Sequence, residues 1–179
     1  MKTLITNFSR TKTLVITFCL FAILCILSNT IFQGDFTYLT QTNGYSAEQV
    51  IALLSSIGTS GRTIHVAILL ADIAMVVLYT IFLLGICYRL SLKLTNNCHL
   101  ITTLTFLPLL LSVDHLTEIF VLFFVLLGYP DVHVNVVNLS STLTSIKFLL
   151  TPIIFFFPIV ILSVTLLIKY KKGRIHNEG

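Results

Sequence analysis

Residues 100–127 read LITTLTFLPLLLSVDHLTEIFVLFFVLL, and this stretch decides the fold. It is longer than the ~20 helical residues that cross the ~30 Å hydrocarbon core of a bilayer. It contains no Lys or Arg, and its only acidic residues are Asp114 and Glu118. The stretch therefore predicts a membrane-spanning helix that carries two acids inside the membrane.

Three further stretches are long and apolar enough to span: 13–32, 63–88 and 142–168. None shows the alternation of a transmembrane β-barrel strand. Only 10% of the residues are charged and 56% are hydrophobic, whereas soluble domains carry about 25% charged residues. This composition excludes a soluble enzyme domain, and four cysteines in 179 residues do not make a disulfide scaffold. We predict an all-α, polytopic membrane protein with one domain, an up-down bundle of four transmembrane helices.

The basic residues predict the orientation of the bundle. They gather before the first span, between the second and third, and after the fourth, as Lys2, Arg10, Lys12, Arg89, Lys93, Lys169, Lys171, Lys172 and Arg174. By the positive-inside rule both termini are cytoplasmic, in a plasma (cytoplasmic) membrane or an endomembrane. The N-terminal run resembles a signal peptide, but no clear cleavage site follows, so we expect it to be retained. Charges beside membrane ends favour lipid headgroups as partners and not nucleic acid.

The first outer loop, 33–62, is the only sizeable soluble segment and contains a helix signal at about 46–57. Ser46 and Gln49 form a capping box, and apolar residues at 50, 53, 54 and 57 share one face. Gly58 and Gly61 are expected to end this helix and form the turn. We predict a short amphipathic helix that covers the bundle or lies on the outer surface. The other connections are expected at about 89–99 and 128–141.

Three of the seven acidic residues lie inside predicted spans: Asp72, Asp114 and Glu118. At about 1.5 Å per residue, Asp72 and Glu118 each lie ~14 Å from the outer end of their span, and Asp114 lies ~20 Å deep. Acids at such depths are costly and usually face the bundle interior. The matched depths predict one cluster, in which at least one carboxyl holds a proton. Such a cluster suits cation binding, proton relay or general acid–base chemistry.

Candidate partners for the acids are His115, Tyr79 and Lys147, and Lys147 either snorkels outward or pairs with Glu118. Arg62 and His65 are placed at the outer mouth, as site residues or interfacial anchors. Helix-locking pairs are the alternative role for the acids. Adjacent Asp114 and His115 lack the spacing of a helical zinc site, so no metal and no cofactor is predicted.

Three functions remain open. The first is binding of a lipid-like or amphiphilic cationic small molecule, with apolar walls from Phe120, Phe123, Phe155, Phe156 and Phe157. The second is an intramembrane enzyme acting by acid–base chemistry on a lipid or sterol-like substrate. In layout, as a small bundle with intramembrane acids, the chain is similar to the emopamil-binding and sigma-2 receptor superfamily, a similarity that transfers no site residue. The third is an accessory subunit, whose acids pair with a partner subunit or a second copy in a homo-oligomer.

Overall fold

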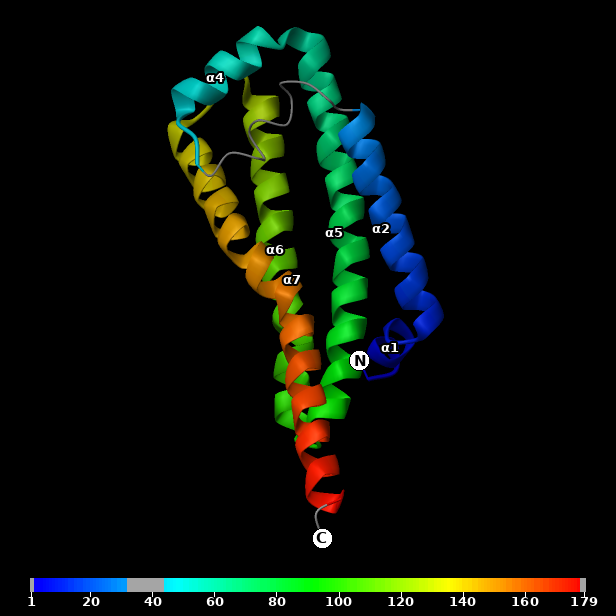
Figure 1. Cartoon of the computed structure of the whole chain (residues 1–179). Coiled ribbons are helices and arrows are strands. Elements are labelled where there is room, and N and C mark those ends of the chain that lie inside the picture. The colour runs from blue at the N-terminus through cyan, green and yellow to red at the C-terminus, as the bar shows by residue number, and fades with distance from the viewer. Residues whose placement is uncertain (1, 32–43, 178–179) are drawn as a thin grey trace.

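The computed structural model describes residues 2–31 and 44–177, and these residues form helices without any strand (Figure 1). The helices are α1 (Lys2–Phe8), α2 (Thr11–Ile31), α4 (Ala47–Ser56), α5 (Gly58–Leu94), α6 (Cys98–Gly128) and α7 (Val134–Asn177). Four of them, α2, α5, α6 and α7, are long and apolar enough to cross a membrane. The all-α prediction and the four spanning stretches are therefore confirmed. Residues 33–43 of the first loop lie outside the described residues.

The connections are shorter than the sequence predicts. Helix α5 continues to Leu94, and Asn97 caps α6 by accepting hydrogen bonds from two backbone N–H groups, so the expected loop 89–99 shrinks to residues 95–97. Helix α7 already begins at Val134, so the expected loop 128–141 shrinks to residues 129–133. The predicted loop includes the polar residues Asn135, Asn138, Ser140 and Ser141, but in the structure they lie on the first turns of α7.

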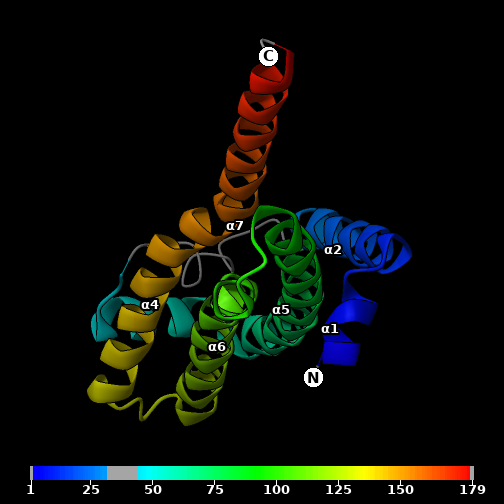
Figure 2. The ribbon, with the colours of Figure 1, turned by 90° about the horizontal axis from the view of Figure 1, so that it is seen from below.

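Helix α5 is central in the arrangement and packs against α2, α6 and α7 (Figure 2). Helix α1, the α5–α6 connection and the end of α7 lie at one end of the molecule, and α4 and the α6–α7 connection lie at the other (Figure 1). The helix ends that carry most of the Lys and Arg residues thus gather at one end.

Helix α1, which the sequence pattern did not predict, is docked against α5 at a glycine. A Cβ atom added at Gly85 would lie 2.5 Å from the backbone carbonyl oxygen of Phe8 and 2.8 Å from Leu14 Cδ2. Both distances are shorter than a Cβ contact allows, so only glycine permits this close approach.

Helix α4 begins at a capping box: the Ser46 side chain accepts from the backbone N–H of Gln49, whose side chain accepts from the backbone N–H of Ser46. Val50 and Leu54 are fully buried against the core. The chain then turns at Gly58, whose φ of +62° suits glycine. Gly61 does not share in this turn, because it lies within α5 and is buried.

The outer surface of the long helices is apolar. Phe124 on α6, Leu127 at the end of the same helix and Ile26 on α2 are each more than 60% exposed. A soluble protein rarely leaves so many large apolar side chains open. These surfaces suit contact with lipid acyl chains.

Candidate functional site

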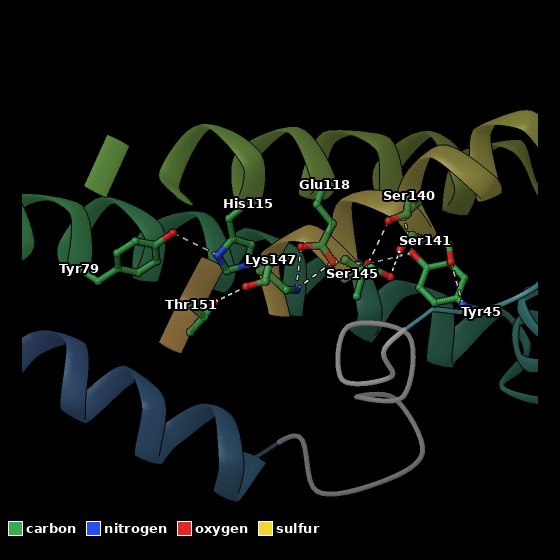
Figure 3. A network of polar contacts seen from close by, with 10 residues as sticks. Tyr45, Tyr79, His115, Glu118, Ser140, Ser141, Ser145, Lys147 and Thr151 are labelled. Atoms are coloured by element: carbon green, nitrogen blue, oxygen red, sulfur yellow. Dashed lines mark hydrogen bonds and ion pairs between the residues drawn. The ribbon is translucent and has the colours of Figure 1, made fainter. Parts of the chain in front are cut away.

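The centre of the candidate site is a buried ion pair between α6 and α7 (Figure 3). Lys147 Nζ lies 2.6 Å from Glu118 Oε2 and donates a hydrogen bond of 2.8 Å to Oε1. Glu118 is only 1% exposed, and the Thr144 hydroxyl donates to the same Oε1 at 2.6 Å. Of the two alternatives for Lys147, pairing with Glu118 is therefore the one observed.

Two further carboxylates flank this pair. Asp72 on α5 is half-buried and interacts electrostatically with both Lys147 and Glu118. Asp114 lies one turn before Glu118 on α6, is half-buried and interacts with the same two groups. Its Oδ2 is buried without a hydrogen-bond partner. The three acids that the sequence placed at matched depths do lie around one lysine.

The register between α5 and α6 explains why these residues meet. Arg62 contacts Tyr129 near one end of the two helices, and Tyr79 contacts His115 nearer the middle. Asp72 lies between the two contact points on α5, and Glu118 lies between them on α6. The two carboxylates are thus within about one helical turn of the same level.

His115 and Tyr79 form a second polar contact deeper in the bundle. The Tyr79 hydroxyl and His115 Nδ1 are 3.3 Å apart, and their rings stack at 6.1 Å between centroids. Phe21 of α2 and Phe155 of α7 pack against the Tyr79 ring. Beside this contact, the hydroxyls of Thr80, the residue after Tyr79, and of Ser112, about one turn before His115, are hydrogen-bonded to each other. His115 thus joins α6 to α5.

Arg62 and His65, placed together at the outer mouth by the sequence, have different surroundings. Arg62 lies 4.5 Å above the Tyr129 ring and donates to the Leu54 carbonyl at 3.0 Å, so it ties α4 to α5 and to the α6–α7 connection. His65 is fully buried, and neither ring nitrogen has a hydrogen-bond partner. His65 is therefore an interior residue and does not line an open mouth.

Sequence reasoning missed a set of hydroxyl residues beside Glu118. We call Tyr45, Ser140, Ser141, Thr144 and Ser145 the hydroxyl seam (Figure 3). The Tyr45 hydroxyl is hydrogen-bonded to Ser140 Oγ and Thr144 Oγ1, and its backbone N–H donates to Ser141 Oγ at 2.9 Å. Burial raises the pKa of the Tyr45 hydroxyl, which therefore stays protonated at neutral pH. The i, i+4 spacing of the α7 hydroxyls is a usable signal, but the loop predicted from the sequence extends to residue 141 and hides it.

Two pockets among the described residues lie away from the acids. One pocket of about 260 Å³ lies between the ends of α5 and α6 and is lined by Tyr88, Cys98 and Thr105, among others. Another, of about 410 Å³, lies at the opposite end and is lined by Phe124, Asp131 and other residues of α6 and α7. Neither is lined by any of the three intramembrane acids.

The aromatic walls expected from the sequence are formed only in part. Phe123 and Phe155 pack against the core, but Phe120 and Phe156 are 57% and 62% exposed and face outward. The difference follows from helix periodicity, because adjacent residues such as 155 and 156 point about 100° apart.

Among the described residues, no three His, Cys, Asp or Glu side chains gather so as to hold a metal ion. Comparisons of the chain with protein families, with curated proteins and with solved structures find no match.

Proposed function

We propose that the four long helices cross the membrane in alternating directions, with both termini in the cytoplasm. The support is the position of most of the basic residues: all except Arg62 and Lys147 belong to segments that lie at one end of the molecule (Figure 1). Lys and Arg accumulate on the cytoplasmic side of membrane proteins. In this orientation α4 covers the outer end of the bundle, with its buried face formed by Val50 and Leu54. Whether the membrane is a plasma membrane or an endomembrane does not alter this arrangement.

We propose further that the protein binds the cationic headgroup of a lipid-like amphiphile at Asp72 and Asp114. The observation that carries this proposal is the imbalance of charge around Glu118. Lys147 already neutralises Glu118, and two more carboxylates lie within electrostatic range of that pair. Acidic side chains inside a membrane protein cost free energy when no positive charge compensates them, and such residues usually have a function. A ligand cation would compensate them.

The exposure of the two aspartates favours a ligand that comes from the membrane. Both are half-buried, whereas Glu118 is closed off. Leu110 and Val113, which neighbour Asp114 on α6, are 60% and 62% exposed. The apolar body of an amphiphile can lie along this surface while its headgroup meets the carboxylate. Binding of such a ligand does not require a closed cavity at the acids. The two pockets described above lie elsewhere, which is consistent with this mode of binding.

The burial and internal pairing of Glu118 weigh against the accessory-subunit alternative for this acid. An acid that pairs with a partner's helix must lie on the outer surface of this bundle. Glu118 is 1% exposed and already paired within the chain. Asp72 interacts with two groups of the same bundle interior.

The experiment is a titration of the purified protein in nanodiscs with a fluorescent long-chain quaternary ammonium compound. We expect Asp114→Asn and Asp72→Asn each to weaken binding about tenfold, because losing a charge interaction at a partly wet site removes roughly 1–2 kcal/mol. The matched control is Asp131→Asn, which neutralises an exposed acid in the α6–α7 connection. A neutral amphiphile of the same chain length controls for partitioning. Equal affinity in all three variants, or equal binding of the neutral compound, would refute the proposal.

A further inference from the structure

Within the hydroxyl seam, a line of hydrogen bonds runs from Tyr45, beside the start of α4, to the buried carboxyl of Glu118. It starts at Tyr45, next to the exposed Ser46 at the beginning of α4. The Tyr45 hydroxyl contacts Ser140 Oγ and lies 3.4 Å from Thr144 Oγ1. Thr144 Oγ1 in turn donates to Glu118 Oε1 at 2.6 Å. Every step of this line is a hydrogen bond between groups that exchange protons.

Three members of the seam, which form the line to Glu118, are buried although their side chains are polar. Ser140 and Thr144 are fully buried, and Tyr45 is 8% exposed. Each hydroxyl can donate one hydrogen bond and accept two, so each can pass its own proton on while receiving another. Glu118 is 1% exposed, so direct contact with outer water does not supply its protons.

We infer that the hydroxyl seam is the route by which protons pass between the outer surface and the intramembrane acids. In the inward direction the Thr144 hydroxyl proton moves to Glu118 Oε1. The Thr144 oxygen takes the Tyr45 hydroxyl proton. The Tyr45 oxygen takes a proton from outer water, either directly or from Ser140, whose oxygen is then reprotonated by water. Each hydroxyl ends with one proton, and one proton has been added to the acid. The outward direction is the reverse.

The charged and polar groups around Glu118 are the groups among which an incoming proton can be shared. Lys147 of α7 pairs with Glu118. Asp72 and Tyr79 of α5 interact with Glu118 electrostatically, and Asp114 lies on its own helix. His115, also on α6, is bonded to Tyr79 and interacts with Lys147. If all were ionised, three carboxylates would share one lysine. Protons that arrive through Glu118 reduce this excess of negative charge.

The inference goes beyond ligand binding and does not depend on it, because protons equilibrate with the acids in the ligand-free protein. The test is therefore a pH jump on ligand-free protein in nanodiscs. The readout is the time course of the infrared C=O band of protonated carboxyl groups. Asp72→Asn, Asp114→Asn and Glu118→Gln assign the band, because each removes one contributor.

The decisive variant is Thr144→Val, which keeps the side-chain shape and removes the hydroxyl that bridges to Glu118. We expect the carboxyl band to respond about 100-fold more slowly, since positioned proton-transfer groups contribute at least this much to rates. The matched control is Thr142→Val on the same helix, because the Thr142 hydroxyl is exposed and donates only to the Asn138 carbonyl. It should respond at the wild-type rate.

Tyr45→Phe provides a second test that does not alter the α6–α7 contact, and it should also slow the response. The inference is overturned if Thr144→Val and Tyr45→Phe respond as fast as the wild type. It is equally overturned if Thr142→Val slows the response as much, or if no assigned carboxyl band changes with pH. If Thr144→Val does not fold, the rate in Tyr45→Phe alone decides between these outcomes. Failure of the ammonium titration would leave this result unaffected.

Discussion

Replacing Lys147 by methionine should destabilise the protein strongly, because it removes one half of a buried ion pair. Methionine keeps the length of the side chain and most of its apolar contacts. What is lost is the ammonium group that lies 2.6 Å from Glu118 Oε2. The Glu118 carboxylate, 1% exposed, would keep only the Thr144 hydrogen bond.

The size of the effect follows from the attraction that is lost and the burial cost that is removed with it. At ~2.8 Å and an effective dielectric constant of about 20, the attraction within the pair is about 6 kcal/mol. The net loss is smaller than this attraction, because removing the lysine also removes the cost of burying its charge. We therefore expect the free energy of unfolding to fall by about 3 kcal/mol, within the range measured for broken buried pairs.

The assay is an SDS titration of the protein in mixed micelles. Because the chain has six Tyr and no Trp, tyrosine circular dichroism reports the tertiary structure. The double variant Lys147→Met with Glu118→Gln should recover most of the stability, since it leaves no unpaired charge.

The matched control is Lys93→Met, which removes an exposed lysine near the end of α5 and should change stability by less than about 0.5 kcal/mol. A loss below ~1 kcal/mol in Lys147→Met would refute the reasoning. So would a double variant as unstable as the two single variants added together, because their effects are coupled if the residues form a pair.

Three further predictions concern packing, capping and orientation. Gly85→Ala should cost about 1–3 kcal/mol by overpacking against Phe8, whereas Gly128→Ala, which meets open space, should be close to neutral; equal unfolding midpoints in detergent would contradict this. Ser46→Ala removes the cap of α4 and should cost about 1 kcal/mol, seen as faster amide exchange in residues 47–56, and unchanged exchange would count against the cap. Exposed Cys98 should react with a membrane-impermeant maleimide only from the cytoplasmic side, and labelling from outside would reverse the proposed orientation.

Much of the fold could be predicted from the sequence because its signals are local. Long apolar runs identify the membrane-spanning helices, and the capping box at Ser46 depends only on neighbouring residues. The ends of α5 and α7 were misjudged because polar residues beyond an apolar run can continue a helix. Helix α1 was missed because its docking depends on Gly85, which is distant in the sequence.

The candidate site also has one part that the sequence predicts and another that only the tertiary structure determines. The depths of Asp72, Asp114 and Glu118 follow from counting residues along helices, so their grouping could be anticipated. Whether Lys147 would snorkel or pair could not, because the rotation of α7 against α6 decides it. The burial of His65 likewise depends on which face of α5 turns inward.

The sequence by itself determined that this protein is suited to lipid and not to water, and that it has four helices able to span a membrane. It also determined that three acids lie within those helices, where an acidic side chain costs free energy. These properties depend on transfer free energies and on the fixed rise of a helix, which are local. Only the tertiary structure decided that one lysine neutralises Glu118 and that Tyr45 reaches α7 to complete a line of hydroxyls. Tyr45 and Ser140 are 95 residues apart, and packing of α4 and α7 brings them together. Contacts of this kind depend on helix rotation and register, which no local pattern encodes.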